Sequence, residues 1–253
     1  MTNSLAFESG ETNQSNSSTH PYHRRKLGCP CPALSILINH NYLTPKDEYT
    51  QIKLTELINA LLECFNLGRA HAFILSITAC LICGNGLSVS IFQLGAHGRL
   101  EHDASITRLD KAEGDYLNPN KCLIERFLGA SADPARITLD DYALRRAELE
   151  AQTPCGLSWI VKFIAYGEVG LTIGVFGHRG PRWIESKKLR TVFLEERLPD
   201  GWIRPENPLG MFEVLKIAYN LNKNMKIYAS NNLNQEIPDG FEEKPDGDGI
   251  STE

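Results

Sequence analysis

The chain of 253 residues is 42% hydrophobic, which is enough to bury one large core, so a single domain is expected. Its formal net charge of −5 and the lack of a basic run longer than residues 23–26 argue against a nucleic-acid-binding surface. Residues 1–20 are rich in Ser, Asn and Thr and contain no apolar stretch like the centre of a signal peptide. We therefore expect an intracellular, cytoplasmic protein.

The chain begins with a polar arm, predicted to be disordered over residues 1–26. It ends with an acidic tail rich in Gly and Pro, predicted to be disordered over residues 232–253. The folded domain is therefore expected over residues 27–231.

Helical spacing of apolar residues dominates this domain. In chain order it predicts helices over residues 32–41, 52–65, 70–82, 138–149, 159–176, 184–196 and 207–223. Thr138 provides an N-cap with an acidic residue three positions later. The alternation typical of strands is scarce, and residues 87–91 are the best candidate. The fold class is therefore mainly α. The apolar segment 70–82 is shorter than the about 20 residues needed to span a membrane, so we expect a central core helix and no integral membrane segment.

Cysteine usage points away from disulfides. Seven cysteines at scattered spacings do not form the framework of a small disulfide-rich protein, which fits a reducing compartment. Cys80 and Cys83 have the spacing of half a zinc knuckle or of a redox pair, but no second pair with ligand spacing follows. We expect both to be small buried hydrophobes.

The segment Pro30-Cys31-Pro32 places a cysteine directly before a helix, because Pro32 fits the first helical turn. A thiol at the positive end of a helix has a lowered pKa and can accept hydrogen bonds from free backbone N–H groups, which suits a metal-bound thiolate. Cys29 offers a second thiol, but only Cys31 lies between prolines. From these residues alone, Cys31 is as easily a bystander as a ligand.

Glu168 lies in the middle of the apolar segment 159–176 and is the only acidic residue between Glu150 and Glu185. A carboxylate held in an apolar wall has a raised pKa and can both accept and deliver a proton. We therefore expect a buried, functional glutamate, because burying a carboxylate without a task is costly.

A further polar cluster is Glu101-His102-Asp103, which by itself is typical of a solvated turn. Several motifs then occur in a recognisable order: Pro30-Cys31-Pro32, Asn39-His40, Glu101-His102-Asp103 with Ser105, and Tyr166-Gly167-Glu168. Together they resemble the signature of the fungal haem-thiolate peroxidases, which comprise the chloroperoxidases and the unspecific peroxygenases. The resemblance runs from about Leu27 to about Pro205 and includes a closing segment at 196–199. It implies a single-domain helical fold with haem between the cysteine-loop helix and a distal apolar helix.

The resemblance also implies a role for each motif. Cys31 would be the proximal ligand of a haem b iron, and a cysteinate in that position favours cleavage of a peroxide O–O bond. Glu168 would be the distal acid-base group, oriented by His102. The other residues expected beside the haem are Leu100, Ile164, Leu171 and Thr172. Glu101, His102 and Ser105 are implied at a Mg²⁺ or Mn²⁺ ion that also touches a haem propionate, and oxygen ligands suit either ion.

Three remaining features concern the loops. His40 is expected to brace the proximal loop, whereas His97 lies in no ligand spacing. Asn41 stands where the family usually has glycine, and asparagine tolerates a left-handed helix end. Asp103 and Arg108 are expected to hold their loop by hydrogen bonds and charge pairing.

We therefore expect a haem-thiolate peroxygenase or peroxidase that uses hydrogen peroxide to oxidise small organic molecules, in fungal secondary metabolism. A non-catalytic haem-binding or haem-sensing module using Cys31-Pro32 is one alternative. A structural protein stabilised by metal on its cysteines is another, which the cysteine spacing disfavours. The residues do not indicate an oligomeric state.

Overall fold

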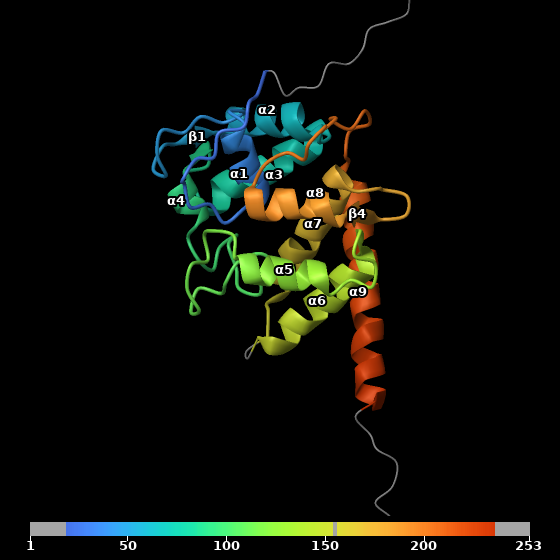
Figure 1. Cartoon of the computed structure of the whole chain (residues 1–253). Coiled ribbons are helices and arrows are strands. Elements are labelled where there is room, and N and C mark those ends of the chain that lie inside the picture. Colours follow the sequence, from blue (N-terminus) through green and yellow to red (C-terminus); the bar gives the residue numbers. More distant parts are fainter. Residues whose placement is uncertain (1–18, 154–155, 236–253) are drawn as a thin grey trace, which may run out of the picture.

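The computed structural model describes residues 19–153 and 156–235, and it is mainly α, as predicted (Figure 1). The helices in these ranges are α1 (Pro32–Asn39), α2 (Leu54–Phe65), α3 (Arg69–Ile82), α4 (Ile91–Leu94), α5 (Lys121–Gly129), α6 (Leu139–Gln152), α7 (Trp159–Phe176), α8 (Ser186–Arg190) and α9 (Met211–Gln235), with a π-helical turn at Thr191–Glu195. Two short antiparallel pairs complete the fold, β1 (Ile52–Lys53) with β2 (Ser88–Val89) and β3 (Arg136–Thr138) with β4 (Trp183–Glu185).

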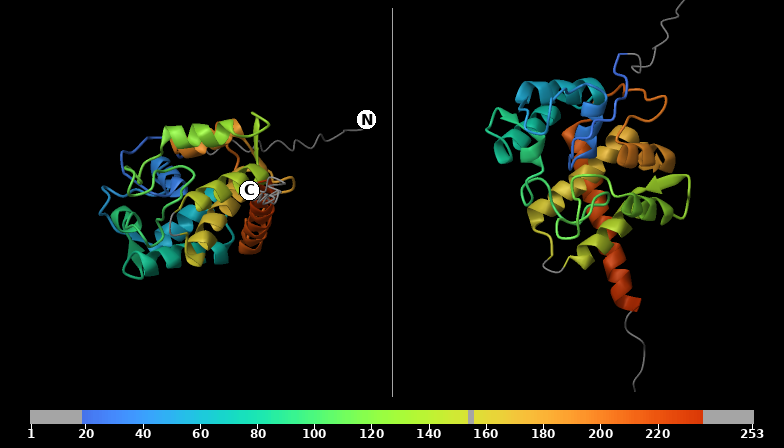
Figure 2. Two further views of the ribbon diagram at one scale, coloured as in Figure 1. Left: turned by 90° about the horizontal axis from the view of Figure 1, so that it is seen from below. Right: turned by 60° about the vertical axis from the view of Figure 1, so that its left-hand side comes forward.

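The long helix α9 runs along one side of the molecule and projects beyond the other helices (Figures 1 and 2). Two glycines of α7 allow it to pack closely against α9 and the segment immediately before α9. A Cβ added at Gly170 would lie 2.8 Å from the carbonyl oxygen of Val214, and one at Gly174 would lie 2.7 Å from the side chain of Leu209. At about 100° per residue, these glycines are about 200° and 240° around the helix from Glu168. Close packing on α9 therefore turns Glu168 to the opposite face of α7.

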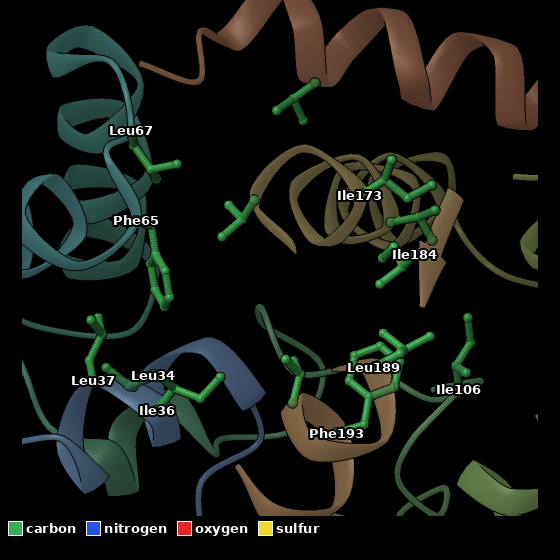
Figure 3. Close-up of a cluster of buried hydrophobic side chains, with 14 of the residues drawn as sticks. Leu34, Ile36, Leu37, Phe65, Leu67, Ile106, Ile173, Ile184, Leu189 and Phe193 are labelled. Carbon is green, nitrogen blue, oxygen red and sulfur yellow. The ribbon is translucent and has the colours of Figure 1, made fainter. Parts of the chain in front are cut away.

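The hydrophobic core lies between α7 and the N-terminal helices. Leu34 of α1, Phe65 of α2, Ile173 of α7 and Leu189 of α8 belong to one buried cluster (Figure 3). Burying a large apolar side chain typically contributes about 1.5–3 kcal/mol. The cluster therefore fixes α1 and α7 relative to each other, and these are the two helices that carry the predicted ligand and the predicted acid-base group.

Helix α1 has the ends that the sequence predicts. Pro32 occupies its first turn, Cys31 is its N-cap, and residues 34–39 are all buried. Asn41 follows the helix with a φ of 58°, the left-handed conformation that asparagine tolerates. In α6, the Thr138 hydroxyl accepts a hydrogen bond from the backbone N–H of Asp141, and the Asp141 carboxylate accepts one from the backbone N–H of Thr138, as the capping pattern predicted.

Strand pairing corrects two predicted helix boundaries. Ile52 and Lys53 pair with β2, so the helix predicted from residue 52 begins at Leu54. The helix predicted over 184–196 divides into β4, α8 and the π-helical turn, because Ile184 pairs with Ile137 of β3. The strand predicted over 87–91 is only two residues long.

Long-range contacts correct two more helices. Helix α9 begins at Met211 rather than 207, because the backbone of Leu209 donates a hydrogen bond to Asn66 and is thus held outside the helix. The predicted core helix α3 is buried on one side only, and Phe73 and Leu81 are exposed on the other. Helix α5 was not predicted.

The predicted arm and tail lie mostly outside the described residues, which exclude 1–18 and 236–253. The described end of the arm is packed: the Tyr22 hydroxyl donates to the carbonyl oxygen of Glu195 at 3.0 Å, and the Arg25 backbone N–H donates to Asn39 at 2.8 Å. At the other end, α9 continues to Gln235, past the boundary predicted at 232. Hydrogen bonds and helix continuity thus extend the ordered part at both ends.

Within residues 19–153 and 156–235, α7 is the one helix whose length and hydropathy would suffice to cross a membrane. A core helix of a globular protein meets the same criteria. In this structure α7 packs against α9.

Candidate active site

The two neighbouring cysteines occupy different environments. Cys31, the N-cap of α1, is exposed. Burial among protein atoms nevertheless raises the pKa of its thiol, while hydrogen bonding from the Leu34 backbone opposes that rise. The pKa of Cys31 is therefore raised, whereas the helix end alone was expected to lower it. The effect of desolvation is larger than that of the hydrogen bonds from backbone N–H groups. Cys29 is buried, burial raises its pKa to about 12, and its thiol donates to the carbonyl oxygen of Cys31 at 3.5 Å. Of these two neighbouring thiols, Cys31 is the one that a ligand can reach.

A buried ion pair holds the cysteine loop, the segment that carries Cys29 and Cys31. Arg108 and Glu196 are 2.8 Å apart, and both side chains are less than a tenth exposed. The same Arg108 nitrogen donates to the carbonyl oxygen of Cys29 at 3.0 Å. Breaking a buried pair leaves an uncompensated charge and costs about 3–5 kcal/mol. This ion pair therefore fixes the loop immediately before Cys31, whereas Arg108 was predicted to hold its own loop. Within that loop it donates to the Thr107 hydroxyl at 2.8 Å.

The C-terminal side of α1 is attached to the same segment. Asn39 donates from its amide to the carbonyl oxygen of Glu196 at 3.0 Å. His40 accepts a hydrogen bond from the backbone of Leu198 at 3.1 Å through Nε2 and is 3.0 Å from the carbonyl oxygen of His20 through Nδ1. The predicted bracing role of His40 agrees with these contacts, and the partner is the closing segment 196–198.

Glu168 stands on the face of α7 that is turned away from α9. Its side chain is 61% exposed, so the prediction of a buried carboxylate is wrong. The physical reason is the glycine contact with α9, which directs the opposite face outward. Exposed apolar side chains on the same helix, Ile160 and Phe163, lie eight and five residues before it. The carboxylate is close enough to Cys31 to contribute to the raised pKa of the thiol.

His102 meets Glu168 across a distance of 3.8 Å between Nε2 and Oε2. The imidazole side chain is 7% exposed, and its Nδ1 lies 2.7 Å from the carbonyl oxygen of Asp103. Because a carbonyl oxygen can only accept a hydrogen bond, Nδ1 must be the donor. This contact fixes the ring so that Nε2, on its other side, is directed toward Glu168. Burial lowers the pKa of His102, but contact with the Glu168 carboxylate overcomes that effect, and the net pKa is raised. The structure thus brings together the two residues predicted as acid-base group and partner.

Ala104 gives the loop around His102 its shape. It has a φ of 63°, which an L-residue adopts only at a cost, and its backbone N–H donates to Asp110 at 2.6 Å. Ser105 lies beside Thr107, whose N–H donates to the Ser105 hydroxyl at 3.3 Å. The turn presents His102 and Ser105 on a fixed backbone.

Glu101 is buried and hydrogen-bonded to a residue that the sequence did not single out. Nδ1 of His97 lies 2.7 Å from Oε2 of Glu101, and its Nε2 lies 3.7 Å from Asp103. Burial raises the pKa of Glu101, and the contact with His97 opposes this. No group of three or more His, Cys, Asp or Glu side chains in the described part of the chain could hold a metal ion. The described residues alone therefore offer no complete cation site, and a cation held at Glu101 would need further ligands.

The model of peroxidase family 2 matches residues 19–207 of the chain, a range that includes every residue of this site. The chain belongs to that family.

Two curated relatives are similar to this chain. An aromatic peroxygenase from Cyclocybe aegerita is 26% identical over 224 residues, which are 76% of this chain and 60% of that protein. An aromatic peroxygenase from Coprinellus radians is 29% identical over 135 residues, which are 45% of this chain and 51% of that protein. The chain thus spans only part of the length of both relatives. The family match confirms the resemblance to the fungal haem-thiolate peroxidases.

The side chains gathered at this site fit a haem. An exposed thiol stands at the N-terminus of α1, and the face of α7 that carries Glu168 also carries the partly exposed apolar side chains of Ile164 and Leu171. Exposed apolar surface of this kind commonly marks a ligand-binding site. Of the residues predicted beside the haem, Leu100, Ile164, Leu171 and Thr172 are all partly exposed, and the Thr172 hydroxyl donates back to the carbonyl oxygen of Glu168. A macrocycle with apolar faces and one metal suits these groups.

Sequence reasoning missed two supports of the site, Glu196 as the partner of Arg108 and His97 as the partner of Glu101. The sequence does contain a signal for the contact between His97 and Glu101, because the two residues are only four positions apart. No local signal connects Arg108 with Glu196, which are 88 residues apart.

Proposed function

We propose that the chain is a haem-thiolate peroxygenase or peroxidase that uses hydrogen peroxide to oxidise small organic molecules. The observation that carries the proposal is the pairing of an exposed Cys31 thiol at the end of α1 with the contact between Glu168 and His102 on the side of α7. The names of the two relatives favour aromatic compounds among the substrates, and secondary metabolism is the setting that we propose.

In this proposal Cys31 binds the haem iron, and the bound haem supplies the centre at which the peroxide O–O bond is cleaved. Glu168 accepts a proton from the near oxygen of the peroxide and delivers it to the departing one, a task suited to a carboxylate within reach of both. His102 orients Glu168 through Nε2, because its Nδ1 is engaged by the carbonyl oxygen of Asp103. The apolar residues on the Glu168 face of α7, Ile164 and Leu171, would exclude water from the substrate side.

The test of the proposal is a spectrum followed by a labelling experiment. The chain loaded with haem is reduced and treated with carbon monoxide, and we expect the strong red shift of the Soret band that a thiolate ligand causes. It is then given ¹⁸O-labelled hydrogen peroxide and a small aromatic compound, and product carrying the label is expected. A thiolate spectrum without any peroxide-dependent product would replace the enzyme by a haem-binding or haem-sensing module. A spectrum without the red shift would exclude both.

A divalent cation is part of the proposal. The contact with His97 uses one carboxylate oxygen of Glu101, Oε2, so the other can bind Mg²⁺ or Mn²⁺ together with the Ser105 hydroxyl and a haem propionate. His102 is placed next to this site by its position in the chain. We expect Glu101→Gln to loosen the haem and to make its retention sensitive to a chelator. Metal analysis of washed, haem-loaded protein decides the point: full haem with no divalent cation would remove the cation from the proposal.

A further inference from the structure

We propose that Arg146 of α6 is the positioning residue that holds the His102 loop against Glu168. The inference rests on the proposed function, since the task of the His102–Glu168 pair is defined by it. Arg146 was not singled out by any motif. It is one of the largest fully buried side chains, at 2% exposure, although arginine is almost never buried without a partner.

On one side, Arg146 holds the loop that carries His102. Its Nη1 donates to the carbonyl oxygen of Ala104, two residues after His102. Ala104 has the left-handed backbone that an alanine adopts only when its surroundings enforce it. Its N–H is held by Asp110 and its carbonyl by Arg146, so these two contacts together enforce the conformation.

On the other side, Arg146 reaches α7 through Glu150. Nη2 of Arg146 lies 3.5 Å from Oε1 of Glu150, and Oε2 of Glu150 lies 2.9 Å from Nζ of Lys162. Hydrogen bonding and charge from Glu150 also add to the raised pKa of Tyr166, which burial causes first. Lys162 and Tyr166 are on α7 within two turns of Glu168. One guanidinium therefore connects the His102 loop with the helix that carries Glu168.

The charge of Arg146 also interacts with the side chains of His102 and Glu168. Burial lowers the pKa of Arg146, and the charges of Glu150 and Glu168 oppose that effect. The positive charge of Arg146 in turn disfavours a proton on His102. Its Nε is buried and has no hydrogen-bond partner among the described residues, so the planar group is held by its two outer nitrogens. Such a fork fixes geometry as well as charge, which a lysine cannot reproduce fully.

The neighbouring Arg145 is a matched control. It is 5% exposed, lies on the same helix and has a buried Nε without a partner among the described residues. Its ion pair is with Glu148 at 3.0 Å, and no hydrogen bond joins it to the His102 loop within the described ranges. Arg145→Met and Arg146→Met therefore remove equivalent buried charges, but only the second releases the loop.

The first measurement uses the haem-free protein. Hydrogen exchange of the backbone amides over residues 101–110 is expected to become faster in Arg146→Met and to stay at the parent rate in Arg145→Met. Arg146→Lys keeps the charge but not the fork, so intermediate exchange is expected, and this variant carries the test if Arg146→Met does not fold. Equal exchange in all variants would overturn the proposal.

The second measurement uses the haem-loaded protein and stopped-flow mixing with hydrogen peroxide. Displacing a positioned group by about 1 Å can cost about 100-fold in rate. We therefore expect Arg146→Met to react about 10- to 100-fold more slowly, with an unchanged CO spectrum. Because Arg146 acts through His102, adding Arg146→Met to His102→Ala should cause no further loss. A full additional loss in the double variant, or an equal loss in Arg145→Met, would overturn the positioning role. A parent protein that does not react with peroxide would refute the proposed function instead, and the exchange experiment would still decide what Arg146 does.

Discussion

Replacing Cys31 with alanine should abolish the thiolate spectrum and remove most of the bound haem. The physical reason is that Cys31 is the exposed thiol at the end of α1, on the side that faces Glu168, and no other side chain at that helix end can replace an iron–sulfur bond. The measurement is the haem content and the spectrum of the reduced, CO-bound protein after reconstitution and desalting.

Two cysteine variants serve as controls. Cys29→Ala removes a buried thiol two residues away, and Cys122→Ala removes the other exposed thiol among the described residues. Both should keep the haem content and the red-shifted spectrum of the parent. Loss of the thiolate spectrum in Cys29→Ala, with retention in Cys31→Ala, would reverse the assignment of the ligand.

Glu168→Gln should slow the reaction with hydrogen peroxide by about 10²–10⁴-fold while the haem spectrum stays the same, since a positioned proton-transfer group typically contributes that much. The amide of glutamine keeps the size of the side chain but cannot take up the proton. His102→Ala should have a smaller effect of the same kind, because His102 orients the glutamate at 3.8 Å and does not itself move the proton. Stopped-flow spectroscopy at the Soret band measures both rates.

Glu63→Gln is the matched control for this experiment. The Glu63 side chain is 63% exposed, close to the 61% of Glu168, and its ionic contact is with His20, away from the His102–Glu168 pair. The control variant should react at the parent rate. If Glu168→Gln also reacted at the parent rate, the acid-base role would have to be abandoned in favour of the haem-binding alternative.

Local signals predicted the parts of the site that depend on neighbours in sequence. Pro32 marks the start of α1, and Thr138 with Asp141 marks that of α6, because proline geometry and side-chain capping act within one turn. The full length of α7 followed from its apolar composition. The exposure of Glu168 did not, because the rotation of α7 is set by Gly170 against α9 and by Gly174 against Leu209, both of which are distant in sequence.

The supports of the site depend on contacts that no local pattern encodes. Arg108 and Glu196 find each other across 88 residues, and β3 and β4 pair across the whole of α6 and α7. A weak signal for Arg146 was present, because it lies seven residues after Leu139 and four after Tyr142 of α6, both of which are buried. Helical spacing thus placed an arginine on the core side, and only the fold shows which carbonyl it contacts.

The attachment of the cysteine loop to the segment 196–198 has a consequence for biosynthesis. Asn39, His40 and Arg108 all take their partners from that segment, across 88 to 158 residues. A growing chain that has exposed Cys31 to the cytosol or to any other compartment still lacks the segment that holds the loop, and contacts of such long range form late in folding. We therefore expect the thiol and the carboxylate of Glu168 to reach their final arrangement only after residues 196–198 have been made. In the proposed function, haem would then be bound after that point rather than by the nascent N-terminal helix.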